Sequence, residues 1–135
     1  MLKSYLRLLR LLRTVSSPSI DKVIELQAWR LRELLKWREY IKILIEAVKE
    51  VFDKDVEVYI FGSAAENRLT VDSDIDVVIV VKEVPRSGIK RAELLDKLWR
   101  AMEARGVPWW YPFEIHIMTK EELSLLREAK FIKML

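Results

Sequence analysis

The chain has 135 residues, of which 51% are hydrophobic and 33% are charged, a balance typical of one globular domain and not of a disordered chain. It has no cysteine, which excludes disulfides and thiolate metal sites, and its net charge at pH 7 is +3. No apolar stretch reaches the ~18–20 residues of a membrane span, and the N-terminus lacks the apolar region of a signal peptide, so we expect a cytoplasmic protein.

The positive charge is concentrated in the first part of the chain. Residues 1–50 hold 11 Lys and Arg against 6 Asp and Glu, whereas residues 51–135 hold 13 against 15. Because the excess is small and the second part is slightly acidic, charge argues against nucleic acid as a partner.

The N-terminal part is predicted to be helical. Residues 1–14 have leucines spaced by three or four and basic residues on another face, the pattern of a short amphipathic helix. From 18 to 52 the pattern stays helical as one helix or two, because no Gly or Pro after Pro18 interrupts it. We expect an N-terminal helical extension at 1–37, followed by the main domain at 38–135.

The rest of the chain alternates between strands and helices, which predicts an α/β (α+β) domain with about three strands. The segment at 75–81 is apolar throughout and is therefore expected to be buried on both faces. The predicted elements are a strand at 56–61, a short helix or turn at 64–69, a strand at 75–81, a helix at 89–104, a strand at 113–118 and a closing helix at 119–135 that opens on a capping box of Thr119 and Glu122.

Two aspartates stand at the start of the buried strand. Residues i and i+2 of a strand share a face, so Asp74 and Asp76 are expected to project together. Their mutual repulsion is relieved by a hard divalent cation such as Mg²⁺. Gly62 and Ser63, at the end of the preceding strand, could hold phosphate oxygens with the backbone and the hydroxyl. The alternative for the aspartates is a solvated turn before a strand.

The joint pattern carries a resemblance to a known family. It reads F-G-S, ten residues, D-I-D and then V-V-I-V-V. This resembles the signature of the DNA polymerase β-like nucleotidyltransferases, and most of all that of their smallest members, the minimal nucleotidyltransferases (MNT). The resemblance covers about residues 38–130. It implies the nucleotidyltransferase fold, a small mixed β-sheet flanked by helices, in which a D-x-D pair and a third acidic residue hold metal ions for nucleotidyl transfer.

Carried over to this chain, the resemblance implies a set of site residues. Glu114 takes the third acidic position, where the family more commonly has Asp, and its alternative is an exposed residue on an edge strand. Arg68, in the turn, is either a triphosphate contact or a solvated residue. The implied catalytic residues and Mg²⁺ ligands, for two ions, are Asp74, Asp76 and Glu114, and the implied contacts of the ATP phosphates are Gly62, Ser63 and Arg68.

Two further features near the third strand are interpreted mainly as structural. His116 shares a strand face with Glu114, and we interpret it as a packed or hydrogen-bonded residue ahead of an active-site contact. The aromatic residues at 109–111 are interpreted as core residues ahead of a base-stacking or partner surface.

The resemblance also implies an activity and a partner. Minimal family members are commonly paired with a helical HEPN-type toxin protein and transfer AMP from ATP to one of its hydroxyls, as antitoxins. Residues 1–14 would then dock that partner or a second copy of this chain, as in a homo-oligomer; their alternative is packing on their own domain. Because Glu114 departs from the family pattern, a non-catalytic nucleotide-binding or partner-stabilising module is an alternative function, as is transfer to a small molecule.

Overall fold

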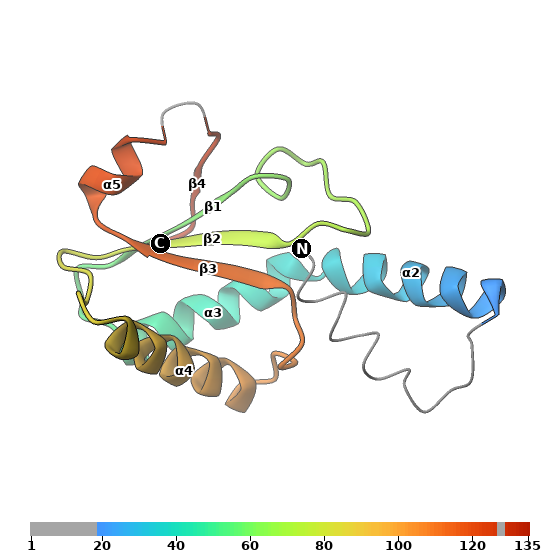
Figure 1. Ribbon diagram of the computed structural model, residues 1–135, viewed down its shortest axis with the longest axis horizontal. Helices are drawn as coiled ribbons and strands as arrows, with labels where there is room; N and C mark the ends of the chain where they lie inside the picture. The colour runs from blue at the N-terminus through green and yellow to red at the C-terminus, as the bar shows by residue number, and fades with distance from the viewer. Residues whose placement is uncertain (1–18, 127–128) are drawn as a thin grey trace.

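The computed structural model describes residues 19–126 and 129–135, so the helix predicted at 1–14 lies outside the described residues. The described part is a four-stranded sheet with two long helices packed beneath one face (Figure 1). This confirms the predicted mixed sheet flanked by helices, with four strands in place of about three. None of the described helices is both long and apolar enough to cross a membrane.

The helical region that follows Pro18 is two helices. α2 spans Ile20–Leu34 and α3 spans Trp37–Val51. Leu34 and Trp37, on either side of the bend, are both buried in the core. Since the bend contains neither Gly nor Pro, tertiary packing sets its position, which the local sequence left undecided. The division into an extension at 1–37 and a domain at 38–135 stays a prediction.

The sheet has the strand order β3-β2-β1-β4. β1 (Glu57–Phe61) and β2 (Ile75–Val80) are antiparallel, whereas β2 and β3 (Phe113–Met118) are parallel and are connected through α4 (Gly88–Ala104). The end of β1 and the starts of β2 and β3 therefore meet at one end of the sheet, the end that α2 passes (Figure 1).

The hydrophobic core lies between the sheet and the helices α3 and α4. Alternate residues of β1 and β2 point into it, as the two-residue period of a strand requires. Each of the fully buried aliphatic side chains contributes about 1.5–3 kcal/mol to folding. The core residues contributed by these elements include Ile41, Leu44, Val48, Val58, Ile60, Ile75, Val77, Ile79, Leu98 and Met102.

The C-terminal segment corrects one prediction. The capping box at Thr119 is present, but α5 ends after five residues (Lys120–Ser124), and β4 (Ile132–Lys133) follows in place of a continuing helix. β4 pairs antiparallel with β1, and the Met134 amide donates to the Val58 carbonyl at 2.7 Å. The otherwise unpaired edge of β1 thus decides the structure of the segment over its local helical pattern.

Helix α2 is fastened to the loop before β3 by aromatic residues. The ring of Trp29 lies 4.8 Å from that of Trp110, centroid to centroid. The hydroxyl of Tyr111, a fully buried residue, donates to the carbonyl oxygens of Glu33 at 3.0 Å and Leu34 at 3.2 Å, at the end of α2. The interpretation of residues 109–111 as core is right for Tyr111, whereas Trp109 is 51% exposed.

The substitution Tyr111→Phe tests how much this fastening contributes to stability. It keeps the ring and removes a buried donor to the carbonyls at the end of α2, so we expect the free energy of unfolding to fall by about 1–2 kcal/mol. Urea unfolding of both proteins measures the change. An unchanged unfolding midpoint would mean that water replaces the hydroxyl without net cost.

Candidate functional site

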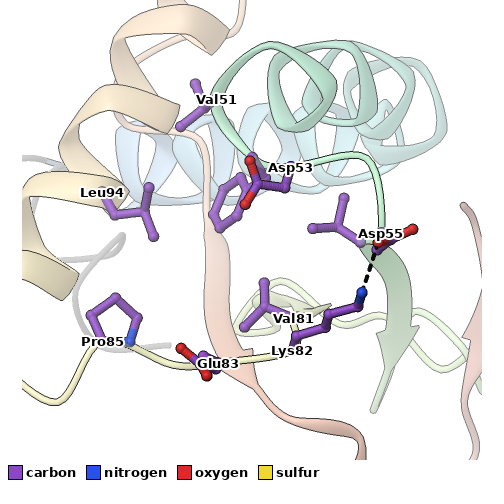
Figure 2. A pocket seen from close by; sticks show the side chains of 10 residues that line it. Val51, Asp53, Asp55, Val81, Lys82, Glu83, Pro85 and Leu94 are labelled. Atoms are coloured by element: carbon purple, nitrogen blue, oxygen red, sulfur yellow. Dashed lines mark ion pairs between the residues drawn. The ribbon is translucent and has the colours of Figure 1, made fainter.

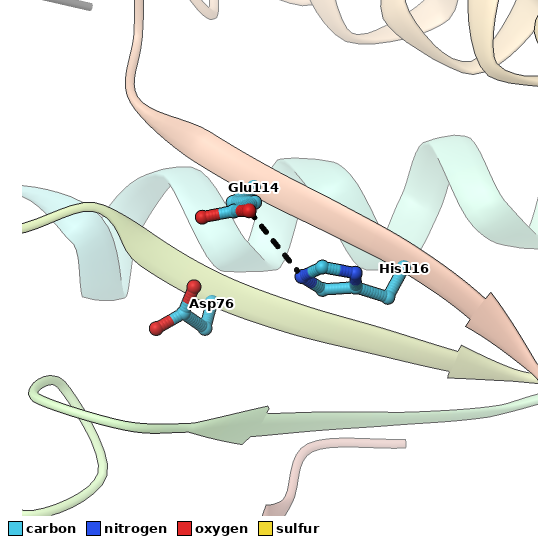
Figure 3. A group of neighbouring side chains, drawn as sticks. All are labelled: Asp76, Glu114 and His116. Atoms are coloured by element: carbon cyan, nitrogen blue, oxygen red, sulfur yellow. Dashed lines mark ion pairs between the residues drawn. The ribbon is translucent and has the colours of Figure 1, made fainter. Parts of the chain in front are cut away.

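Acidic side chains from two neighbouring strands meet at the α2 end of the sheet. In the parallel register of β2 and β3, Asp76 stands opposite Glu114, and on the other side it pairs with Phe61 of β1. His116 is two residues further along β3, on the same face as Glu114. Figure 3 shows Asp76, Glu114 and His116 projecting together from β2 and β3, with α3 behind the sheet.

These three side chains form a group with suitable donors for a divalent cation. One ligand atom of each lies within 4.8 Å of those of the other two, and Nε2 of His116 is 3.7 Å from Oε1 of Glu114. The Glu114 side chain is 52% exposed, so the group is open to solvent. Two carboxylates favour hard cations such as Mg²⁺ or Mn²⁺, and an imidazole is compatible with the latter.

The group is electrostatically strained without a cation. Partial burial, followed by the negative charge of Glu114, raises the pKa of Asp76 to about 6, against the opposing effect of His116. A cation near both carboxylates would reverse this shift, because it favours their charged forms.

The glycine turn after β1 is built around Asp76. Gly62 has a φ of 69°, and a Cβ added to it would lie 2.5 Å from Oδ2 of Asp76. The amide of Glu66 donates to the carbonyl of Gly62 at 3.0 Å, and that of Arg68 to the carbonyl of Ser63 at 2.8 Å. The segment predicted as a short helix or turn is therefore a turn, and it brings the backbone of Gly62 against the carboxylate.

The second residue of the D-x-D pair has a different environment. Asp74 precedes β2 and is not part of the group formed by Asp76, Glu114 and His116. Its side chain is only 8% exposed, and its Oδ1 lies 3.9 Å from Nη2 of Arg30, a buried residue of α2. The structure therefore brings Asp76 and Glu114 together and pairs Asp74 with a cation of the protein itself.

The two other residues of the predicted phosphate site lie in the turn. Ser63 is partly buried and directly follows Gly62. Arg68 is 72% exposed and forms an ion pair with Glu66 at 2.5 Å, within the turn. Its part in binding phosphate stays a prediction.

One residue near the site was missed by sequence reasoning, and another has contacts on two sides. His116 is predicted to be a packed or hydrogen-bonded residue; its ring lies 5.8 Å from that of Phe61, centroid to centroid, and its Nε2 faces Glu114. Arg30 was not considered, although it lies four residues before Leu34 and seven before Trp37, both buried. An arginine in an apolar helical stripe was the signal that could have found it.

A separate hollow of about 620 Å³ lies at the opposite end of the sheet. Figure 2 shows its lining, which comes from the end of α3, the segment between α3 and β1, the loop after β2 and α4. Lys82 and Asp55 form an ion pair at its edge, at 2.9 Å. Neither Asp76, Glu114 nor His116 lines this hollow, so it is separate from the candidate metal site.

Three alanine substitutions separate the two constraints on Gly62. Gly62→Ala meets both a positive φ and the Asp76 carboxylate, Gly106→Ala meets a positive φ alone, and Gly88→Ala meets neither. We expect Gly106→Ala to lower the free energy of unfolding by about 1 kcal/mol, Gly62→Ala by at least about 2 kcal/mol, and Gly88→Ala to leave it nearly unchanged. Urea unfolding measures all three. Equal losses for Gly62→Ala and Gly106→Ala would mean that Asp76 moves aside freely.

The raised pKa of Asp76 makes Asp76→Asn a pH-dependent stabilising change. Well below its ordinary pKa of 3.8 the carboxyl is protonated whether the chain is folded or unfolded, and it costs nothing; the penalty of ionising it in the folded protein grows as the pH rises from there and is complete above about pH 6. In the presence of a chelator we expect the variant to be more stable than the wild type by roughly 1–2 kcal/mol at about pH 7.5, after allowing for solvent screening of a half-buried group, and by much less at about pH 4. Urea titrations at the two pH values test this, and a pH-independent difference would contradict it.

The chain is similar to a known protein family and to a solved structure. A crystal structure of a candidate nucleotidyltransferase from Sulfolobus solfataricus is similar to 76% of this chain and 84% of that one, with 20% sequence identity and a TM-score of 0.49. No curated protein has significant sequence similarity to the chain. Residues 41–134 match the family described as nucleotidyltransferase domain, which is more than half of the chain. This protein therefore belongs to the nucleotidyltransferase domain family.

Proposed function

We propose that this chain is a Mg²⁺-dependent nucleotidyltransferase that transfers AMP from ATP to a hydroxyl of an acceptor, and that Asp74, Asp76 and Glu114 hold the metal ions. The observation that carries the proposal is the juxtaposition of Asp76 and Glu114 on adjacent strands, directly beside the Gly62 turn. Two carboxylates at this separation repel each other, and a site that accepts this cost is suited to a cation.

In this proposal the glycine turn binds ATP, and Glu114 meets the acceptor. The backbone of the turn at Gly62 and Ser63 holds phosphate oxygens of ATP close to Asp76, an approach that a side chain at position 62 would block. The metal ions, when bound, neutralise the charge of the phosphates and of the leaving pyrophosphate. Glu114 faces solvent and can be reached by an acceptor hydroxyl.

The transfer itself exchanges one phosphorus–oxygen bond for another. The acceptor oxygen forms a bond to the α-phosphorus, the bond from that phosphorus to the bridging oxygen breaks, and pyrophosphate leaves with the electron pair. The hydroxyl proton passes to the Glu114 carboxylate as general base. His116, with Nε2 at 3.7 Å from Glu114, is placed to hold that carboxylate in position.

For the acceptor we propose a HEPN-type toxin protein, which this chain would inactivate as the antitoxin of a cytoplasmic toxin–antitoxin pair. The support is the resemblance of the F-G-S and D-I-D motifs to those of the minimal nucleotidyltransferases. A second candidate function is that of a nucleotide-binding or partner-stabilising module without transfer, which the Glu at position 114 favours. Transfer to a small molecule is the third.

Transfer of label from α-labelled ATP into host lysate tests the function. With Mg²⁺ present, we expect one labelled protein band with the wild type and none with Asp76→Asn or Glu114→Ala, a loss of roughly 10²-fold or more. Glu114→Asp should retain partial activity, since it keeps the carboxylate. Glu103→Gln, which removes an exposed carboxylate of α4, is the matched control and should label as the wild type does.

The outcomes discriminate between the candidates. Label in a small product that depends on the same carboxylates would favour the small-molecule acceptor. Folded protein that binds ATP but gives no label sensitive to the variants would favour the binding module. Labelling that survives both Asp76→Asn and Glu114→Ala would contradict the proposed site.

A further inference from the structure

We propose that helix α2 is part of the acidic site and that Arg30 is a positioning residue, which holds the loop that carries Asp74 in its metal-binding arrangement. This rests on the proposed function and adds to it a residue that lies before the segment matched by the family.

Arg30 is the link between α2 and that loop. It is 3% exposed, and its guanidinium donates from Nε to the carbonyl of Val71 and, at 3.3 Å, from Nη2 to the carbonyl of Ser73. The same Nη2 lies 3.9 Å from Oδ1 of Asp74. One side chain thus contacts three of the four residues of the loop at 71–74.

The contact distances indicate what Arg30 does for Asp74. Its contacts with the two carbonyls are hydrogen bonds, and its Nη2 also lies 3.9 Å from Oδ1 of Asp74. The two hydrogen bonds hold the backbone that leads to Asp74, so one side chain both positions the loop and faces the carboxylate. The positive charge also offsets the cost of burying Asp74 near two other acidic residues.

The loop has little freedom apart from its attachment to Arg30. The amide of Thr70 donates to Oγ of Ser73 at 2.9 Å, and the amide of Ser73 donates to the carbonyl of Thr70 at 3.0 Å, which closes the loop into a compact turn. Immediately after it, the amide of Ile75 donates to the carbonyl of Pro112 at 2.8 Å, at the start of β3. A turn that is rigid in itself moves as a unit, so its anchor decides where Asp74 lies.

The same helix also holds the loop that leads into β3. Trp29, next to Arg30, packs on Trp110, and Tyr111 bonds to the end of α2. The loops that precede Asp76 and Glu114 are therefore both attached to the last two turns of α2. A helix with these two attachments fixes the relative positions of the strand ends that carry the carboxylates.

Binding of Mn²⁺, measured by calorimetry on the full chain without nucleotide, tests the role of Arg30. The variants are Arg30→Gln, which removes the charge and most donors, and Arg30→Lys, which keeps the charge but cannot hold two carbonyls at once. Arg32→Gln, exposed on the same helix, is the matched control. Urea unfolding of each variant, and its circular dichroism, show that the protein measured is folded.

We expect Arg30→Gln to weaken Mn²⁺ binding roughly tenfold or more, Arg30→Lys to weaken it less, and Arg32→Gln to leave it unchanged. If Arg30→Gln does not fold, the comparison of Arg30→Lys with Arg32→Gln decides. Unchanged binding in the folded Arg30 variants would overturn the proposal, and tighter binding would show that Arg30 competes with the metal. A wild type that binds no Mn²⁺ would instead overturn the proposed function on which the role of Arg30 rests.

Discussion

The repulsion between Asp76 and Glu114 is the constraint on which the rest of the site depends. The register of β2 and β3 fixes the two residues opposite each other, so neither can avoid the other without breaking the sheet. Asp76 bears the cost, because burial and then the charge of Glu114 raise its pKa to about 6. The protein gives up stability at this pair, whereas the register pairs on either side of it, Ile75 with Phe113 and Val77 with Ile115, are apolar. A loss of folding stability of this kind is expected at a site that binds a cation.

The two aspartates of the D-x-D pair show two ways of dealing with a buried negative charge. Asp74 is compensated within the protein, by a guanidinium that also holds the backbone just before it. Among the described residues, His116 partly offsets the charge of Asp76, and the backbone of Gly62 lies directly against its carboxylate. Without a bound cation, the charge of Asp74 is thus neutralised within the protein, whereas that of Asp76 is neutralised only in part. Binding of a cation would then depend most on Asp76 and Glu114, with Asp74 supplied from a fixed loop.

The sequence predicted what depends on neighbours along the chain, and it missed what depends on contacts across the fold. The apolar run after Asp76 and the capping box at Thr119 were enough to place β2 and the start of α5. Glu114 was found through a motif, because its partner is set by strand register and not by spacing. β4 was missed since its strand conformation comes from the free edge of β1, and Arg30 since its partners lie some forty residues further along the chain.

Arg30 has a consequence for how the limits of the catalytic unit are defined. The segment that matches the family, 41–134, contains all three carboxylates and the glycine turn, yet the contact that orders the Asp74 loop comes from residue 30. A sheet and its crossover helix can bring carboxylates into register, but they cannot by themselves fix a loop that precedes a strand. An element outside the sheet must do so, and here α2 has the contacts for it. A fragment of residues 41–134 would then keep the three carboxylates but lose the contact that holds the Asp74 loop in position.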